Sequence, residues 1–258
     1  MEILKAHLTK NDCYKKASKA SHVGILVHST GAVNKNLKRY VDSPDRLGVN
    51  QYNNTWNRSG TDKCVHAFIG YDKNQKVIVA ETLPLDYACW GSGKGKNGSY
   101  NYNPTAHIQF EICQGSDTDE TYYKQAIAVA EEYCAYLCKQ RGWSAKNITS
   151  HREAAEAGYA SNHGDPCSWM KCFGDSMDKF RDRVAKRLGE GKVEATTTTS
   201  TPKVETGYRT YTVQRGESLW TIARDELGKG KRYREIMELN GLKSDLILAG
   251  QKIKLPVK

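Results

Sequence analysis

The hydrophobic pattern of the chain first predicts β-strands. Residues 22–30 (HVGILVHST) form a short apolar run that contains His28 near its end, as expected of a buried strand. Residues 64–72 and 76–82 are two further apolar runs separated by the segment KNQ, which indicates a β-hairpin. Residues 105–114 (TAHIQFEICQ) alternate strictly between apolar and polar side chains and therefore predict another strand.

The predicted strand at residues 105–114 has two chemically different faces, because successive side chains of a strand point to opposite sides. One face is apolar and carries Ile108, Phe110 and Ile112. The opposite face carries His107, Gln109, Glu111 and Cys113. This strand therefore offers ionisable side chains on one of its faces.

Two segments have the three- and four-residue spacing of apolar side chains that is typical of amphipathic helices. Residues 119–143 begin with acidic residues and continue as a regular amphipathic pattern. Residues 176–188 (SMDKFRDRVAKRL) end with basic residues, which interact favourably with the C-terminal end of a helix dipole. Strands mixed with helices predict an α/β domain, and the pattern leaves the order of the strands open.

A linker divides the chain into two predicted domains. Residues 189–207 (GEGKVEATTTTSTPKVETG) are rich in Thr, Gly and charged residues and poor in large apolar ones, so they do not build a core. A large domain, residues 1–188, precedes this linker, and a small domain, residues 208–258, follows it. The small domain has the predicted order strand, helix, helix, strand, with Ser218 as the N-cap of its first helix.

The composition is that of a soluble globular protein, with 38% hydrophobic and 26% charged residues. No stretch approaches the roughly 18 consecutive apolar residues needed to span a bilayer, so no stable membrane association is expected. The N-terminal residues lack the apolar segment and small-residue cleavage site of a secretory signal. We therefore expect synthesis in the cytoplasm, and any target outside the cell has to be reached by another route.

The net charge of +10 favours polyanionic partners. The chain has no basic run interleaved with aromatic residues and no recognition-helix signature, so nucleic acid is not expected as a partner. An anionic bacterial cell wall is the alternative polyanion.

The eight cysteines are expected to be mostly free thiols, because a chain of this size without a secretory signal does not suggest a disulfide framework. No Cys-x-x-Cys motif occurs. Cys134 and Cys138 lie four residues apart on a predicted helix, where Cys most often acts as a small buried apolar residue.

The small domain resembles the LysM carbohydrate-binding domain over its whole length. The resemblance is carried by YTVQRGESLWTIA, by Leu239-Asn240 and by the closing LILAGQKIKLP. It implies a βααβ fold that binds the N-acetylglucosamine-containing glycan of peptidoglycan or chitin. The glycan groove of the family then corresponds here to Gly216, Glu217, Ser218, Leu219, Asn240, Gly241 and Leu242.

Three side chains of the large domain are candidates for a catalytic zinc site, which needs three protein ligands and leaves a fourth position to water. His28 closes a predicted strand, where a ligand is held rigidly. His151 and Asp165 lie in the segment SHREAAEAGYASNHGDPCSW, and His163 lies two residues before Asp165.

The large domain resembles the zinc-dependent N-acetylmuramoyl-L-alanine amidases of the amidase-2 type over most of residues 20–185. The carriers, in the order of the family, are ILVHST, CVHAFIGYDKNQKVIVAETLPLDYACWGSG, AHIQFEICQ, SHREA and NHGDPCSW. The resemblance implies a mixed central sheet flanked by helices and one Zn²⁺ ion bound by His28, His151 and Asp165. Some relatives use a cysteine as the third ligand, and Cys167 lies only two residues beyond Asp165, so Asp165 is favoured with Cys167 as the alternative.

The resemblance also implies roles for three further residues. Glu111 is implied as the catalytic glutamate, at the end of its strand. His163 occupies the position of a lysine that steadies the developing oxyanion in relatives. His66 matches a family histidine, and we expect it to support the site from outside the ligand set.

The expected function is hydrolysis of the amide bond between N-acetylmuramic acid and L-alanine in peptidoglycan, by a monomer that LysM directs to the cell wall. The expected setting is a phage or prophage endolysin released through a holin-type membrane lesion, with a bacterial autolysin as the alternative. Two other functions are weighed: a LysM-targeted cysteine endopeptidase and a wall-recognition protein without catalysis. The endopeptidase is disfavoured because no cysteine is predicted at a helix start after a loop, where a thiolate would be stabilised.

Overall fold

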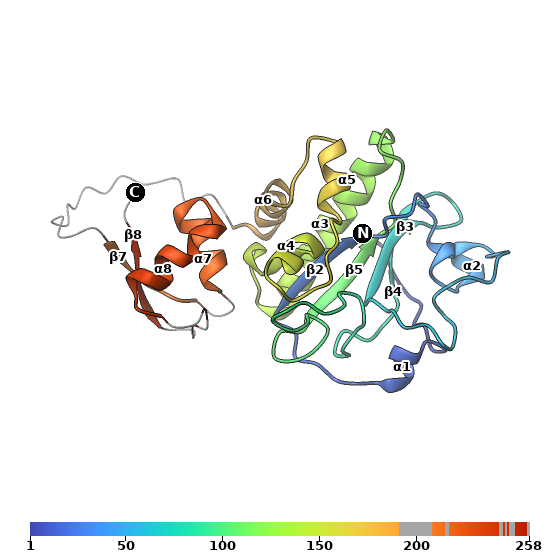
Figure 1. The fold of residues 1–258 in the computed structure, drawn as a ribbon. Helices are drawn as coiled ribbons and strands as arrows, with labels where there is room; N and C mark the ends of the chain where they lie inside the picture. The colour runs from blue at the N-terminus through green and yellow to red at the C-terminus, as the bar shows by residue number, and fades with distance from the viewer. Residues whose placement is uncertain (191–207, 215–216, 243–244, 246, 248–250, 257–258) are drawn as a thin grey trace. The chain divides into compact units, whose positions relative to one another are not determined.

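The computed structural model describes residues 1–190, 208–214, 217–242, 245, 247 and 251–256. The chain divides into two compact units, Met1–Lys192 and Val193–Lys258 (Figure 1). Most of the predicted linker, residues 191–207, lies outside the described residues.

A six-stranded sheet with the order β1-β4-β3-β5-β2-β6 forms the centre of the first unit. Only β3 and β4 run antiparallel, and every other neighbouring pair is parallel. The predicted hairpin and the mixed sheet are therefore confirmed. The strands are β1 Ile3–Lys5, β2 Gly24–Ser29, β3 Ala67–Tyr71, β4 Val77–Glu81, β5 His107–Ile112 and β6 Ile148–Ser150.

Two long helices, α3 (Glu120–Arg141) and α6 (Met177–Leu188), confirm the two predicted amphipathic segments. Asp119 caps α3 by accepting a hydrogen bond from the Tyr122 N–H, and Gly142 ends it in the left-handed conformation at φ 66°. The pattern did not predict the shorter helical segments, which are α1 Asp12–Lys16, α2 Pro44–Leu47, α4 His151–Glu156, α5 Cys167–Cys172, η1 Leu37–Arg39 and η2 Ala145–Asn147.

The sheet is buried on both faces. Ile108, Phe110 and Ile112 pack with α3, α5 and α6 in the main core, as the alternation predicted. The opposite face is covered by loops and short helices, and Phe68 and Cys113 are fully buried there. Figure 1 shows α3, α5 and α6 gathered on one side of the sheet. The polar face of β5 therefore lies in the interior of the unit.

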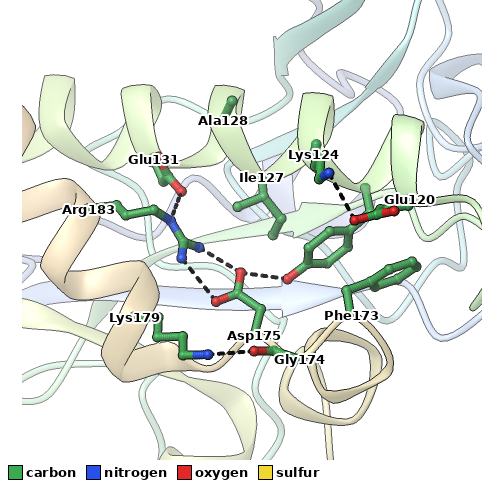
Figure 2. Close-up of a pocket in the computed structure, with 11 residues that line it drawn as sticks. Glu120, Lys124, Ile127, Ala128, Glu131, Phe173, Gly174, Asp175, Lys179 and Arg183 are labelled. Atoms are coloured by element: carbon green, nitrogen blue, oxygen red, sulfur yellow. Dashed lines mark hydrogen bonds and ion pairs between the residues drawn. The ribbon is translucent and has the colours of Figure 1, made fainter.

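Ion pairs and a hydrogen bond that join α3, α6 and the segment before α6 line an open hollow of about 430 Å³ (Figure 2). Arg183 donates through Nη1 and Nη2 to the two carboxylate oxygens of Asp175, at 3.0 and 2.6 Å. Its Nε donates to Glu131, and the Tyr123 hydroxyl donates to Asp175 at 2.8 Å. Because Arg183 of α6 pairs with Glu131 of α3 and with Asp175, we interpret these contacts as a clasp between the two helices.

Three histidines form a buried group beside the sheet. The ring centroids of His22 and His66 lie 5.0 Å apart. Burial lowers the pKa of His22 to about 4, of His66 to about 3 and of His107 to about 4. Both ring nitrogens of His22 are buried and have no hydrogen-bond partner among the described residues. These rings are therefore neutral in the folded protein at neutral pH.

The second unit has the predicted βααβ order. Strands β7 (Tyr208–Thr212) and β8 (Lys252–Pro256) pair antiparallel. Between them lie α7 Leu219–Leu227, η3 Gly230–Arg232 and α8 Tyr233–Leu239. Ser218 caps α7 by accepting from the Thr221 N–H, as predicted, and a small core that includes Ile222, Ile236 and Leu255 holds the elements together. Among the described residues of both units, no helix has the length and apolar character required to cross a bilayer.

Arg183→Ala is expected to lower the free energy of unfolding by about 1–3 kcal/mol, because it removes a donor from two buried carboxylates. The side chains of Asp175 and Glu131 are only 9% and 6% exposed. Urea unfolding of the full chain measures the change. Lys179→Ala is the matched control, since Lys179 is exposed and donates only to the carbonyl of Gly174. An equal loss in both variants would contradict the clasp.

His22→Leu is expected to reduce the acid sensitivity of the fold. The pKa of His22 is about 4 in the folded state and 6.5 as the ordinary value, so the unfolded chain binds more protons between these values. Stability is therefore lost as the pH falls from about 6.5 to about 4, and the substitution removes about 2 kcal/mol of this loss. Urea unfolding at the two pH values, with a chelator present, measures it. His7→Gln, outside the buried group, should leave the pH dependence unchanged, and an unchanged dependence in His22→Leu would refute the explanation.

Candidate metal centre

Strand β2 places His28 beside Glu111. The two residues are register partners on the parallel strands β2 and β5, so their side chains lie on the same face of the sheet. Neighbouring strands are about 4.8 Å apart. His28 is 1% exposed, and its ring lies inside the unit at the carboxyl end of the strand.

His151 is the first residue of α4, directly after β6. Ser150 pairs with Val27 in the register of β2 and β6, so His151 follows beside His28. A capping box fixes the helix start: the Ser150 hydroxyl accepts from the Glu153 N–H, and a Glu153 carboxylate oxygen accepts from the Ser150 N–H at 2.9 Å. Arg181 donates to both oxygens of Glu153 and holds this cap against α6.

Asp165 approaches the two histidines from the loop before α5. The backbone N–H of Ser29 donates to Asp165 Oδ2 at 3.3 Å, and the N–H of Arg152 donates to the Asp165 carbonyl at 3.2 Å. The loop is therefore tied to the end of β2 and to the first turn of α4.

The three candidate ligands converge on one point. His28 Nδ1 lies 3.0 Å from His151 Nδ1 and 3.3 Å from Asp165 Oδ2, and His151 Nδ1 lies 3.4 Å from Asp165 Oδ1. All the ligand atoms lie within 4.8 Å of one another. The thiol of Cys167, the alternative third ligand, donates to Ser150 Oγ at 3.4 Å and does not belong to this group.

The chemistry of this donor set fits a divalent metal ion. Burial lowers the pKa of His28, so its ring is neutral at neutral pH. Burial opposes ionisation of Asp165, but its close contacts with the His151 and His28 rings outweigh the burial and hold the pKa of Asp165 below its usual range. Two imidazole nitrogens and one carboxylate are ligands that Zn²⁺ accepts.

Glu111 lies on the same face of the sheet. Its Oε2 atom is buried and has no hydrogen-bond partner among the residues that the structure describes. Burial raises the pKa of Glu111 well above its usual range, and the negative charge of Asp165 raises it further. This carboxyl group therefore holds a proton more readily than an exposed glutamate does.

His163 lies beside this group, exposed to solvent. Its ring centroid is 4.7 Å from that of His151, and its Nδ1 lies 3.0 Å from Ser161 Oγ. His66 lies one step further from the centre: its Nδ1 accepts from the Gln109 N–H at 3.0 Å, and its Nε2 donates to the Tyr87 carbonyl at 2.9 Å.

The prediction that no cysteine lies at a helix start after a loop is wrong. Cys167 is the first residue of α5 and follows a loop, although the sequence did not predict a cysteine at a helix start. Burial nevertheless raises the pKa of the Cys167 thiol. The thiolate that a cysteine peptidase requires is therefore disfavoured at this helix start.

In the second unit, the side chains of the predicted glycan-binding residues are partly engaged within the fold. The carboxylate of Glu217 accepts from the Tyr211 hydroxyl at 2.6 Å and from the Gln214 N–H at 2.7 Å. Asn240 donates to the carbonyls of Ile236 and Lys254 and accepts from the Lys254 N–H, each at 2.7 Å. Ser218 and Leu219 begin α7, Gly241 and Leu242 follow α8, and Gly216 lies outside the described residues.

Sequence reasoning gave no role to two residues that contact the candidate ligands. Gln109 Oε1 lies 3.1 Å from His28 Nε2, and Ser161 Oγ lies 3.3 Å from His151 Nε2. Gln109 carried a signal, since it is an amide side chain on the polar face of a central strand, two residues before Glu111. Ser161 lies in an irregular segment without a motif of its own.

Two family models match the chain. The N-acetylmuramoyl-L-alanine amidase model matches residues 19–168, more than half of the chain, and the LysM domain model matches residues 211–256. The chain is 28% identical over 184 residues to N-acetylmuramoyl-L-alanine amidase XlyB of Bacillus subtilis (strain 168), covering 71% of this chain and 51% of the relative. It is 28% identical over 154 residues to an endolysin of Listeria phage A511, covering 55% and 43%. The chain thus spans about half the length of the curated relatives it matches.

A solved structure has the same fold as the first unit. The Staphylococcus aureus hydrolase AmiA, crystallised in complex with its ligand, matches with a TM-score of 0.52 and 21% identity, covering 75% of this chain and 87% of that chain. The predicted resemblances to the amidases and to LysM are therefore confirmed. The chain belongs to the N-acetylmuramoyl-L-alanine amidase family and carries a LysM domain in its second unit.

Proposed function

We propose that the protein is a zinc-dependent N-acetylmuramoyl-L-alanine amidase that hydrolyses the amide bond between N-acetylmuramic acid and L-alanine in peptidoglycan. The observation that carries the proposal is the convergence of His28, His151 and Asp165 within 4.8 Å, beside Glu111, whose Oε2 has no hydrogen-bond partner in the described part of the chain. A LysM domain in the same chain supports a cell-wall substrate.

His28 and His151 would hold the ion through their converging Nδ1 atoms, and Asp165 would hold it through its carboxylate. When bound, Zn²⁺ lowers the pKa of a water molecule and polarises the carbonyl of the scissile amide. The three residues come from a strand end, a helix start and a loop that is hydrogen-bonded to both, so backbone contacts hold Asp165 beside the two histidines.

Glu111 is the general base and general acid in this proposal. Its Oε2 takes a proton from the attacking water and later delivers a proton to the leaving nitrogen of L-alanine. A raised pKa suits both steps, because a group that titrates closer to neutral pH both accepts and returns a proton.

His163 donates a hydrogen bond to the oxyanion that forms on the scissile carbonyl. Its exposed ring lies at the edge of the ligand group, where a substrate has access. Its Nδ1 is close to Ser161 Oγ, so Nε2 is the atom that faces the substrate in this proposal.

The LysM domain binds the glycan of the wall and keeps the catalytic unit at its substrate. Residues 208–258 contain eleven Lys and Arg and six Asp and Glu, which leaves a charge of +5 (11 − 6) that favours an anionic wall. We propose that the chain acts as a monomer, made in the cytoplasm and reaching the wall as a phage or prophage endolysin at lysis.

Glu111→Gln is expected to lower the rate of wall hydrolysis by about 10²–10⁴-fold, because it removes the group that moves the proton. The measurement is the release of new L-alanine amino termini from purified Gram-positive cell walls, with EDTA and with zinc added back. Chelation should abolish the release, and zinc should restore it. Glu156→Gln, on an exposed turn of α4, is the matched control and should retain full activity.

Three other results would overturn this proposal. Lysis that survives EDTA but stops after thiol blocking would assign a cysteine endopeptidase. Binding to walls without any cleavage would assign a recognition protein. New amino termini other than L-alanine would place the cut at a different bond.

Soluble N-acetylglucosamine oligosaccharides are expected to release the inactive Glu111→Gln chain from cell walls, because they compete for the LysM domain. Sedimentation of walls with bound protein measures the release. Malto-oligosaccharides of the same length lack the N-acetyl groups and should release none. Equal release by both sugars would mean that binding depends on charge or on nonspecific contacts.

A further inference from the structure

We propose that one hydrogen-bonded frame, built from Gln109, Asn101, Ser92 and Ser161, fixes the ring tautomer of both histidine ligands. This inference rests on the proposed zinc site and deepens it. Gln109 and Ser161 are positioning residues: each contacts the Nε2 atom of one imidazole, so that Nδ1 is the ring nitrogen left for a metal ion.

The first branch of the frame holds His28. Gln109 is fully buried, and its Oε1 lies 3.1 Å from His28 Nε2. Its Nε2 donates to the Tyr100 carbonyl and to Asn101 Oδ1, both at 3.1 Å. Because both of these partners are acceptors, the amide is oriented with its oxygen toward His28. An oxygen acceptor at this distance requires the proton of the neutral ring to be on Nε2.

The orientation of Asn101 is determined in the same way. Its Oδ1 accepts from the backbone N–H of Ser92 at 3.0 Å and from the Ser92 hydroxyl at 2.9 Å. Its Nδ2 donates to the Gly93 carbonyl at 3.3 Å. A backbone N–H is a donor only, so the Asn101 oxygen must face Ser92, and the same oxygen receives the Gln109 amide.

Gly91 leaves the space that the Gln109 amide occupies. A Cβ atom at position 91 would lie 2.5 Å from Gln109 Oε1 and 2.8 Å from a methyl group of Val65. Any side chain there would displace the oxygen that faces His28. The segment from Gly91 to Asn101 therefore fixes Gln109 through both its hydrogen bonds and its shape.

The second branch holds His151 from the same residue, Ser92. The Ser92 carbonyl accepts from the Ser161 N–H at 2.9 Å and from the Ser161 hydroxyl at 3.2 Å. Ser161 Oγ lies 3.3 Å from His151 Nε2. Ser161 Oγ also lies 3.0 Å from His163 Nδ1. A hydroxyl has one proton and two lone pairs, so with its proton directed either to the Ser92 carbonyl or to His163 Nδ1 the oxygen can accept from His151 Nε2–H.

Both branches end on Ser92, which is fully buried. The two rings are therefore not oriented independently: one segment sets the protonated side of each. Without the frame, each neutral ring would divide between two tautomers, and only one of them leaves Nδ1 free for a metal. Loss of a partner of this kind typically costs 10–100-fold in metal affinity.

The tautomers are measured directly on the zinc-free full chain. Long-range ¹H–¹⁵N spectra of histidine-labelled protein, recorded above neutral pH, distinguish Nδ1–H from Nε2–H rings. We expect Nε2–H for His28 and His151 in the wild type. Gln109→Met should give a mixture at His28, and Ser161→Ala should give a mixture at His151.

Zinc affinity, measured by competition with a chromophoric chelator, is expected to fall 10–100-fold in each variant. Two matched controls should stay within about twofold of the wild type. Gln114→Met changes a partly buried glutamine that bonds the Ser29 hydroxyl, and Ser168→Ala removes an exposed hydroxyl that bonds the Gly164 carbonyl. Thermal unfolding of each zinc-free variant shows whether the fold is retained. If Gln109→Met does not fold, the zinc affinity and the His151 tautomer of Ser161→Ala test the frame.

The outcomes separate this inference from the proposed function. An Nδ1–H tautomer for either ring in the wild type, unchanged tautomers in both variants, or unchanged zinc affinity in folded variants would each overturn the frame. A wild-type chain that binds no zinc would overturn the zinc amidase, and the tautomers of the zinc-free protein would then decide on the frame by themselves.

Discussion

The parallel pairing of β2 with β5 on one side and β6 on the other is the constraint on which the candidate metal centre depends. It places His28 in register with Glu111 and brings the start of α4, with His151, beside the end of β2. Parallel strands end at the same edge of a sheet, so one edge collects all of these groups. The long hydrophobic face against α3 and α6 holds this pairing in place.

Burying polar groups beside a sheet is costly unless each finds a partner. On this face of the sheet, the carbonyls and amides of the segment from Gly91 to Asn101 supply many of those partners. The two candidate histidine ligands, His28 and His151, use their ring nitrogens differently. Their Nε2 atoms contact protein oxygens, while their Nδ1 atoms face each other. Ring nitrogens and carboxylate oxygens that converge in this way form a donor set that a divalent cation would stabilise.

The two units differ in the chemistry of their interiors. The first unit buries ionisable groups such as His28 and Glu111, and burial shifts their pKa values away from the ordinary ones. The second unit is a small apolar core between two strands and two helices. Its Asn240 side chain ties α8 to β8 through hydrogen bonds with the backbone of Ile236 and Lys254.

The sequence by itself determined the elements with a long or regular pattern. The alternation of β5, the amphipathic spacing of α3 and α6, and the start of α7 after Ser218 are visible because side chains of one face repeat at a fixed period. The motifs around His28 and His151 were sufficient to indicate the amidase family, and those of residues 208–258 to indicate LysM.

Only the tertiary structure decided what the short elements do. Strands β1 and β6 have three residues each, which is too few to show a period, although His151 follows directly after β6. The Ser150-x-x-Glu153 spacing is typical of a capping box at a helix start. The spacing does not show that Arg181 of α6 donates to the Glu153 carboxylate and so attaches this cap to α6. The contacts of Gln109 and Ser161 link residues far apart in the chain, and no local pattern encodes such contacts. They arise because the sheet and its loops bring these residues together in the buried interior, where each polar atom must find a partner.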